Sequence, residues 1–369
     1  MSGPQTTPLT AWHRDHDARM VEFAGFDMPV MYAGGIREEV GCVRDRVGLF
    51  DLCHMGRLVL TGPDRVAAAD RVVTQNVARI PEGAIRYALL CLPGGGVLDD
   101  VLVYRGAEAV HVVVNAANRA QDDAWFREHT AAFDVRIDNI SDDQTMLALQ
   151  GPRSRAVLER ICDADLDALR YYRFTAGRLL GRAEALVSRT GYTGEDGFEL
   201  FFGRDEAVAV WEALLQAGAG EGIGPIGLGA RDVCRTEAGM PLYGHEMDRE
   251  TTPLEAGLDF GVDLQKDFLG RDALVAQRAA GVPRERVGLV AKGKRVPREG
   301  CRVLRDGEEI GRVTSGTWSP TLACPIAMAL VAAGGAGDGT GLEAELRRRR
   351  LPLRLESLPF FSRKRKKRG

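Results

Sequence analysis

A glycine loop between two apolar runs places the strongest constraint on the fold of this chain. Pro93 and three glycines separate an alternating apolar run, residues 85–91, from a β-branched run, residues 97–104. This pattern predicts two antiparallel strands joined by a longer hairpin loop. Two adjacent acids, Asp99 and Asp100, lie inside the second strand. Because side chains alternate across a strand, at least one carboxylate faces an apolar surface, where it needs a structural partner or a ligand with a basic nitrogen.

Short helices and further strands are expected around this hairpin. Thr7 is a candidate N-cap with Pro8 at the first helical position, and apolar residues recur at helical spacing from Ile36 to Val47, which predicts a helix over residues 36–46. The sequence also predicts helices at 65–73, 119–131 and 152–162, a loop at 50–56, and strands at 57–61, 110–114, 146–150, on both sides of a glycine loop within 187–200, and within 252–262. Because regular βαβ alternation is missing, we expect an α+β fold rather than a Rossmann core.

The last part of the chain has a different pattern. From about residue 287, short strands alternate with turns and helical periodicity disappears. This predicts a small barrel or sandwich, with a domain boundary near residues 281–284. A length of 369 residues suits two to three domains, and a hydrophobic content of 45% is enough for sizeable cores.

Composition and charge argue against several classes of protein. The net charge is −3, so no overall positive field favours nucleic acid, and the basic runs 347–350 and 363–368 are expected to be solvated surface. No apolar run reaches the roughly 18 residues of a membrane span, and the N-terminus lacks the pattern of a signal or transit peptide. Seven scattered cysteines without Cys-x-x-Cys spacing indicate reduced thiols, and His245, Glu246 and Asp248 lack metal-ligand spacing. We therefore expect a cytoplasmic protein with no metal, membrane or nucleic acid partner.

Polar residues in strand and loop contexts are the candidates for a binding site. Asn115 and Asn118 follow a predicted strand, although asparagine also forms turns at such places. Glu199 lies inside an apolar strand after a glycine-rich loop, either as an outward side chain of a half-solvated strand or as a ligand contact. Arg231 follows a glycine-rich loop at the start of a helix, which suits a carboxylate ligand and equally a surface ion pair.

Several motifs occur in order along nearly the whole chain. They are VEFAGFDMP at residues 21–29, HMG at 54–56, GGVLDD at 95–100, VNAAN at 114–118, ALQGP at 148–152, GLGARDVCR at 227–235 and SPTL at 319–322. Together they resemble the motifs of the aminomethyltransferase (T-protein) family of the glycine cleavage system. So many ordered matches are not expected by chance.

The resemblance implies an α+β fold of three domains, arranged as a cloverleaf around a central folate pocket. Two intertwined α+β lobes form the folate-binding region, and a β-barrel follows at the C-terminus, in agreement with the boundary expected from the pattern. A monomer is expected. The implied folate-binding region is 1–282, with one lobe at about 1–50 plus 140–224 and the other at 51–139 plus 225–282, and the barrel is 283–369.

The resemblance also implies a reaction. A member of this family takes an aminomethyl group carried on the dihydrolipoyl arm of H-protein and passes its one-carbon unit to tetrahydrofolate. The products are methylenetetrahydrofolate, ammonia and the free dithiol arm. Tetrahydrofolate is then the co-substrate, lipoylated H-protein is the partner and supplies the lipoyl group, and no metal is required.

The family motifs assign roles to individual residues. By its match, Asp100 is catalytic: it faces the reactive bridging nitrogen of folate and stabilises the positive charge that develops there. Strand alternation alone does not choose between Asp99 and Asp100, since a one-residue slip of register exchanges them. Glu199 and Asn115 match positions that hydrogen-bond the pterin edge, Arg231 matches a clamp on the glutamate carboxylate, and Met55 is expected near the transfer point. The implied cofactor-binding positions are Met55, Tyr87, Leu102, Tyr104, Val113, Asn115, Tyr171, Tyr192, Glu199 and Arg231.

The chain departs from the family pattern in two places. Cys53 stands where serine is usual, and we interpret it as a small buried residue rather than a reactive thiol. The basic tail is longer than expected and is a candidate for electrostatic steering of an acidic H-protein.

Two other functions are alternatives to the aminomethyltransferase function that the motifs imply. Folate-dependent demethylases of small methylated compounds share the fold and the cofactor pocket. Non-catalytic folate-binding relatives carry a Lys-Gly-Cys-type motif after the arginine helix, whereas residues 239–244 here are GMPLYG.

Overall fold

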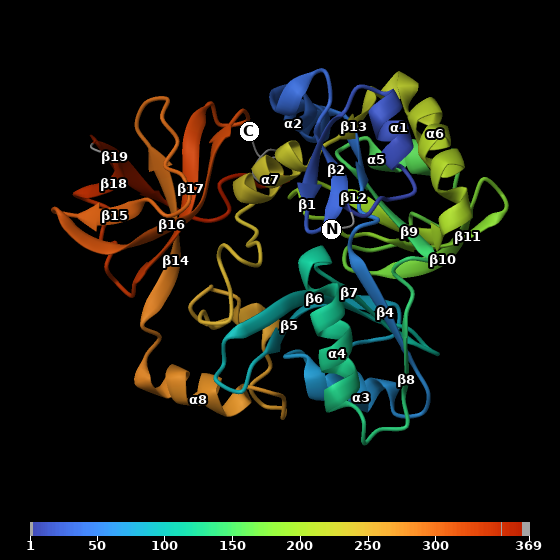
Figure 1. The fold of residues 1–369 in the computed structure, drawn as a ribbon, viewed down its shortest axis with the longest axis horizontal. Helices are drawn as coiled ribbons and strands as arrows, with labels where there is room; N and C mark the ends of the chain where they lie inside the picture. Colours follow the sequence, from blue (N-terminus) through green and yellow to red (C-terminus); the bar gives the residue numbers. More distant parts are fainter. Residues whose placement is uncertain (1–2, 348, 364–369) are drawn as a thin grey trace. The chain divides into compact units, whose positions relative to one another are not determined.

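The structure is a computed structural model that describes residues 3–347 and 349–363. Within these ranges the chain forms two compact units, the first from residues 3–69, 77–87 and 101–232 and the second from 70–76, 88–100, 233–347 and 349–363. Helices and strands are mixed along the chain, and a closed six-stranded barrel follows at the C-terminus (Figure 1). The expected mixed fold class with a C-terminal barrel is therefore confirmed. Apart from Arg363, the basic run 363–368 lies outside the described residues.

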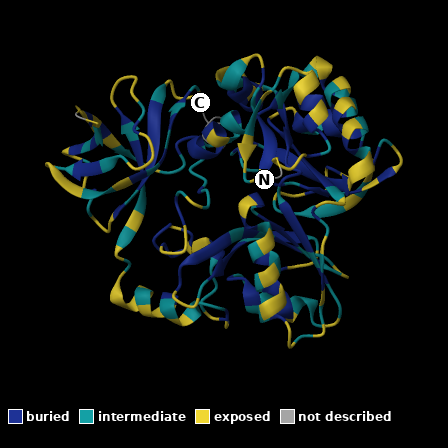
Figure 2. Ribbon diagram, in the orientation of Figure 1, coloured by how far each residue is buried: buried dark blue, intermediate teal, exposed yellow. Residues whose placement is uncertain are grey.

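A six-stranded sheet forms the centre of the first unit. Its strand order is β10-β11-β12-β9-β3-β13. Buried apolar side chains, among them Leu147, Phe198, Leu200 and Trp211, pack on one face of it, and Figure 2 shows the buried residues along its strands. Because side chains alternate, the other face of β12 carries Glu199. The strands are β3 (Val47–Asp51), β9 (Gln144–Gln150), β10 (Phe174–Leu179), β11 (Ala183–Ser188), β12 (Gly197–Gly203) and β13 (Ile223–Ile226).

Three strands of this sheet, β3, β10 and β13, were not predicted. Strand β3 occupies residues 47–51, directly after the predicted helix 36–46 and overlapping the loop predicted from residue 50. It lies between antiparallel β9 and parallel β13 and is buried along its whole length. A strand that is buried on both faces lacks the alternation that marks a half-buried strand, so the loop prediction was wrong.

The predicted hairpin belongs to a second, five-stranded sheet. Its order is β5-β6-β7-β4-β8. The expected strands over 85–91, 97–104 and 110–114 are confirmed with shifts of at most one residue, and so is the strand at 57–61. The strands are β4 (Gly56–Thr61), β5 (Ala84–Cys91), β6 (Val97–Arg105), β7 (Val110–Val114) and β8 (Arg136–Asn139).

The helices follow the sequence prediction with some corrections. Helix α1 begins at Thr10 rather than Pro8, because the Thr7 carbonyl accepts the Thr10 N–H at 3.2 Å and closes a turn before the helix. Helix α5 is shorter than the expected 152–162. None of the helices among the described residues is long and apolar enough to span a membrane. The remaining elements are α1 (Thr10–Asp15), β1 (Arg19–Phe23), β2 (Phe26–Met31), α2 (Gly35–Asp45), α3 (Arg65–Val72), α4 (Arg119–His129), α5 (Ser154–Leu158), α6 (Ala207–Ala217), α7 (Leu228–Glu237) and α8 (Arg271–Ala280).

A closed barrel of six strands lies in the second unit. Its strands close in the order β14-β17-β16-β15-β18-β19 around a core that includes Leu289, Val313 and Ala329. The strand expected within 252–262 was wrong: the described residues there form turns and a 3-10 turn at Asp259–Gly261. Proline at 253 and glycine at 257 both disfavour a regular ladder. The barrel strands are β14 (Arg284–Ala291), β15 (Arg302–Arg305), β16 (Glu308–Ser319), β17 (Cys324–Ala332), β18 (Leu342–Leu346) and β19 (Arg349–Glu356).

A buried Tyr–His–Asp chain holds α1 against the six-stranded sheet. Asp51, at the end of β3, accepts hydrogen bonds from the Thr7 hydroxyl (2.7 Å) and the Cys53 backbone N–H (2.8 Å), and it lies 3.1 Å from His13 Nε2. His13 Nδ1 lies 2.8 Å from the Tyr32 hydroxyl. Burial of the Asp51 carboxylate acts against its ionisation, but the hydrogen bonds and charge of His13 outweigh it and lower the pKa of Asp51 to about 2.

Asp51→Asn is expected to lower the free energy of unfolding by about 2 kcal/mol at neutral pH. The pKa of Asp51 falls from 3.8 to about 2 on folding, so its stabilisation is present above 3.8 and is lost as the pH falls through about 2. Denaturant unfolding from neutral pH to pH 2 measures the effect, and the difference between wild type and variant should shrink as the pH falls. Asp167→Asn, whose side chain is 81% exposed, is the control. A difference that stays constant with pH would contradict the role of the Asp51 charge.

Candidate functional site

The pleat of β6 separates the two acids of the hairpin. Asp100 lies on the same strand face as Leu102 and Tyr104, whereas Asp99 lies on the opposite face and is fully buried (0% exposed). Asp100 is half-buried. Leu102 pairs across the ladder with Val113 of β7, so Val113 belongs to the Asp100 face as well. Three cofactor-binding positions implied by the family motifs therefore share a face with the implied catalytic acid.

A second group of residues surrounds the Glu199 carboxylate. Glu199 on β12 pairs with Ser188 on β11, and both side chains are buried. Thr190 Oγ1 donates a hydrogen bond to Glu199 Oε2 at 2.5 Å, and the Tyr104 hydroxyl donates to the same oxygen at 3.5 Å. No hydrogen bond from a described residue reaches Oε1. The carboxylate is thus held through one of its two oxygens.

The charge of Glu199 is influenced by burial and by three neighbouring groups. Burial raises the pKa of the Glu199 carboxyl, while the Thr190 hydrogen bond, the positive charge of Arg231 and the Tyr104 hydrogen bond act in the opposite direction. Burial, together with Tyr171 and Glu199, raises the pKa of Tyr172 well above its ordinary value. Glu199 therefore lies in a mostly dry site in which hydroxyl groups and one guanidinium favour its ionised form.

Arg231 and Tyr192 contact each other on the first unit. Arg231 lies near the start of α7, and its guanidinium carbon is 4.6 Å from the centre of the Tyr192 ring, a cation–π contact. Tyr192 lies in the loop 189–196 between β11 and β12. The predicted residues Tyr104, Tyr192, Glu199 and Arg231 are thus brought together by contacts or electrostatic interaction.

Gln150 anchors the loop 189–196. Its amide Nε2 donates to the Thr190 carbonyl and its Oε1 accepts from the Thr193 hydroxyl, both at 2.9 Å. A Cβ at Gly191 would lie 1.9 Å from Gln150 Oε1, and one at Gly197 would lie 2.4 Å from Gln150 Nε2. An added Cβ at either glycine would therefore displace the Gln150 amide from its hydrogen bonds to the loop that carries Thr190 and Tyr192, and at Gly197 it would also meet the Leu149 carbonyl at 2.6 Å.

Gly191→Ala is expected to weaken the binding of tetrahydrofolate about tenfold or more and to lower thermal stability, because the added methyl group displaces the Gln150 amide. Gly41→Ala on helix α2 is the matched control: a Cβ there meets no atom within 4 Å, and alanine favours a helix interior. Isothermal titration and thermal unfolding measure both effects. Unchanged binding by Gly191→Ala would show that the loop position does not matter to the ligand.

Met55 follows a buried histidine. His54 is 1% exposed and contacts the rings of Phe23 and Phe26 at centroid distances of 5.8 and 6.4 Å. Burial and the nearby charge of Arg231 lower the pKa of His54 to about 3, so the imidazole is neutral at physiological pH. Met55 itself is half-buried. The HMG motif therefore adds no charge near Arg231.

The other predicted positions are more scattered. Asn115 is half-buried directly after β7, and Tyr87 is half-buried on β5. Tyr171 is 48% exposed and contacts the more buried Tyr172 edge-on at 4.9 Å. Sequence reasoning missed Ser188, Thr190 and Tyr172, which surround Glu199. The only available signal was the SRTGY pattern, in which hydroxyl residues two positions apart lie on the same side of an extended segment.

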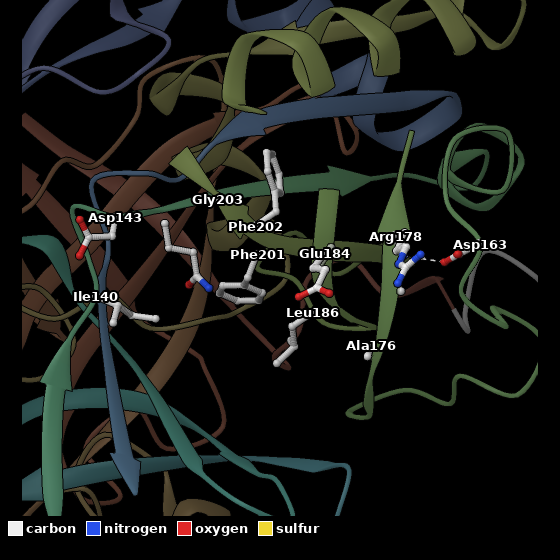
Figure 3. A pocket seen from close by; sticks show the side chains of 13 residues that line it. Ile140, Asp143, Asp163, Ala176, Arg178, Glu184, Leu186, Phe201, Phe202 and Gly203 are labelled. Atoms are coloured by element: carbon white, nitrogen blue, oxygen red, sulfur yellow. Dashed lines mark hydrogen bonds between the residues drawn. The ribbon is translucent and has the colours of Figure 1, made fainter. Parts of the chain in front are cut away.

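An open cavity of about 770 Å³ lies at the other end of the sheet face that carries Glu199. Figure 3 shows Glu184, Leu186 and Phe201 along it, with Arg178 and Asp163 at its edge. None of the predicted site residues lines it. A cavity of only about 20 Å³ lies against Tyr104 and Val113 and shares Leu186 and Phe201 with the larger one. Tyr104 thus contacts Phe201, which lines both cavities, and its hydroxyl donates to the Glu199 carboxylate.

Metal and thiol chemistry receive no support from the described residues. Among them, no group of three or more His, Cys, Asp or Glu side chains is placed to hold a metal. Cys53 is 6% exposed, and burial together with the charge of Asp51 raises the pKa of its thiol well above the ordinary value. A buried, protonated thiol is a poor nucleophile, which favours the interpretation of Cys53 as a small packing residue.

Comparisons with known proteins give the family. The GCVT N-terminal domain matches residues 9–266, and the glycine cleavage T-protein C-terminal barrel domain matches residues 284–362. An aminomethyltransferase of Rubrobacter xylanophilus is 49% identical over 97% of this chain and 95% of its own length. One of Moorella thermoacetica is 47% identical over 99% of this chain and 100% of its own. The crystal structure of glycine cleavage system aminomethyltransferase T from Bartonella henselae matches with a TM-score of 0.90 at 32% identity, over 97% of this chain and 98% of that one. The chain therefore belongs to the glycine cleavage T-protein family.

Proposed function

We propose that this protein is the tetrahydrofolate-dependent aminomethyltransferase of a glycine cleavage system. It releases ammonia and transfers the one-carbon unit from the aminomethyl-dihydrolipoyl arm of H-protein to tetrahydrofolate, giving methylenetetrahydrofolate. The observation that carries the proposal is the buried Glu199 carboxylate, whose Oε2 is held by Thr190 and Tyr104 while no described residue hydrogen-bonds Oε1.

The Glu199 site fits the edge of a pterin. That edge presents neighbouring N–H donors, and an ionised carboxylate only accepts hydrogen bonds, so the two are complementary. A dry site strengthens such bonds. Half-buried Asn115, whose amide both donates and accepts, is proposed as a second contact to the same edge.

Two roles are candidates for Arg231. The family motif suggests a clamp on the glutamate carboxylate of folate, but the charge of Arg231 acts on both Glu199 and His54. An extended folate keeps its glutamate at the end opposite the pterin. If Glu199 binds the pterin edge, Arg231 therefore acts at the pterin end, and we propose it as the cation that stabilises the Glu199 carboxylate and stacks on Tyr192.

Asp100 is the proposed catalytic residue. It lies half-buried on the β6 face that also carries Leu102 and Tyr104. An ionised carboxylate that faces the reacting nitrogen of tetrahydrofolate orients it and stabilises the positive charge that develops as the carbon is transferred. The fully buried Asp99, on the opposite face, is proposed as the structural member of the pair.

A folate-dependent demethylase is the second candidate, because it uses the same cofactor pocket with a different donor. Supplying the purified protein with tetrahydrofolate and either aminomethylated H-protein or a small methylated amine separates the two. The proposal predicts folate-dependent ammonia release with H-protein and none with the amine. Methyltetrahydrofolate and the demethylated amine formed from the small methylated amine, with no turnover of H-protein, would assign the chain to the demethylases. Tight folate binding without turnover of either donor would make it a non-catalytic folate binder.

The proposed function also implies a partner protein and a cellular location. Lipoylated H-protein is the proposed partner and the source of the lipoyl group. A cytoplasmic location is proposed on the scattered cysteines, all seven of which are free thiols in the structure.

A further inference from the structure

Two hydroxyl side chains connect Tyr104 with Glu199. Ser188 ends β11 directly opposite Glu199, and Thr190 follows it in the loop 189–196. Ser188 Oγ lies 2.7 Å from Thr190 Oγ1 and 3.4 Å from the Tyr104 hydroxyl. Both side chains are almost completely buried, at 0% and 2% exposure. Tyr104, Ser188, Thr190 and Glu199 thus form one continuous buried cluster.

The carboxylate sets the direction of these hydrogen bonds. An ionised carboxylate cannot donate, so Thr190 gives its single hydroxyl proton to Glu199 Oε2. Thr190 then has only lone pairs to offer Ser188, and Ser188 must donate to Thr190 across the 2.7 Å contact. The Thr190 backbone is fixed at the same time, because its carbonyl accepts from the Gln150 amide. Each hydroxyl therefore has a defined donor role.

The terminal torsion of a glutamate side chain is broad and has no strong preference of its own. In a buried site, the orientation of the carboxylate plane therefore depends on the hydrogen bonds that it receives. The titratable and charged groups that face Glu199 are Tyr104 from β6, Tyr172 before β10 and Arg231 from α7. Of the two hydroxyl groups that donate to Glu199, Thr190 is the closer, at 2.5 Å against 3.5 Å for Tyr104.

We propose that Thr190 is a positioning residue which, supported by Ser188, ties down Oε2 of Glu199 so that Oε1 is presented to the N–H donors of the pterin edge. This inference rests on the proposed function, because it assumes that Glu199 binds the pterin of tetrahydrofolate. It adds to that function a residue which recognises no ligand itself but determines how well the pterin edge is recognised.

Thr190→Val tests the inference, because valine keeps the shape of threonine and removes only the hydroxyl. The dissociation constant for tetrahydrofolate is expected to rise about tenfold. Tetrahydrofolate binding is expected to weaken at low pH as Glu199 becomes protonated, which gives the acidic limb of a plot of affinity against pH. In Thr190→Val this limb is expected to move to higher pH by about one unit, because the lost hydrogen bond favoured the ionised carboxylate. Thr190→Ser, which keeps the hydroxyl, should restore both values. Thr175→Val, on neighbouring β10, is the control, since the Thr175 hydroxyl bonds only a backbone carbonyl.

The outcomes separate this inference from the function on which it rests. A wild-type protein that does not bind tetrahydrofolate overturns the proposed function and this inference with it. If the wild type binds tetrahydrofolate and Thr190→Val has the same dissociation constant and the same acidic limb, the inference alone is overturned. A Thr190→Ser variant that behaves like Thr190→Val also overturns it. If thermal unfolding shows that Thr190→Val is not folded, Ser188→Ala replaces it. Weaker tetrahydrofolate binding and a smaller shift of the acidic limb in the same direction would support the inference. Wild-type values of both would overturn it.

Discussion

Asp100→Asn is expected to lower the rate of aminomethyl transfer by about 100- to 1,000-fold, while the dissociation constant for tetrahydrofolate rises only about threefold. The amide keeps the size of the side chain but removes the negative charge that stabilises the developing positive charge on the folate nitrogen. The interaction is thus lost mainly in the transition state, so the rate falls much more than the affinity. Single-turnover kinetics with aminomethylated H-protein and titration of tetrahydrofolate measure the two quantities separately.

Asp99→Asn is the matched control on the same strand. Asp99 is fully buried on the opposite face of β6, so its replacement should lower thermal stability and leave the single-turnover rate of the folded fraction within a fewfold of wild type. Near-normal transfer by Asp100→Asn would remove Asp100 from the mechanism. If Asp99→Asn instead lost transfer while Asp100→Asn kept it, the roles of the two acids would be exchanged.

Glu199→Gln is expected to raise the dissociation constant for tetrahydrofolate about 100-fold, which corresponds to about 3 kcal/mol, with little change in the rate from the bound complex. A carboxylate accepts hydrogen bonds through both oxygens, whereas the amide of glutamine has one acceptor and one donor group. An N–H group that faces the pterin N–H donors leaves buried polar groups without partners. The substitution keeps the volume of the side chain, so the surrounding core should be preserved.

Glu184→Gln is the control for Glu199→Gln. Glu184 lies on neighbouring β11, is exposed and lines the open cavity of Figure 3 rather than the Glu199 cluster. Its replacement should leave the dissociation constant unchanged. An equal loss of affinity in both variants would place the ligand in the open cavity and contradict the assignment of Glu199. Thermal unfolding of both variants shows whether any loss of binding reflects loss of the fold.

The parts of the fold that the sequence predicted are those with a local signal. The hairpin of β5 and β6 follows from a glycine loop between alternating runs, and the barrel follows from short strands separated by turns. The strand β3 was missed because it pairs with β9 and β13 and is buried throughout, so its pattern does not alternate. Its neighbours are distant in sequence, and no local pattern reports them.

The candidate site was predictable to a similar extent. Alternation showed that one acid of the hairpin faces an apolar surface, and that acid is the fully buried Asp99. The family motifs pointed to Glu199 and Arg231. They did not point to Thr190 or Ser188, because hydroxyl residues in a glycine-rich segment look like ordinary turn residues. Only the pairing of β11 with β12 places the two hydroxyls against the Glu199 carboxylate.

The central claim is that the protein transfers a one-carbon unit from H-protein to tetrahydrofolate. The most direct test is a single turnover of the purified protein with aminomethylated, lipoylated H-protein in the presence and absence of tetrahydrofolate. Equal amounts of ammonia and methylenetetrahydrofolate, formed at a rate that depends on tetrahydrofolate and is lost in Asp100→Asn, are the predicted result. Ammonia release that is the same without tetrahydrofolate, or no methylenetetrahydrofolate from an intact donor, would contradict the claim.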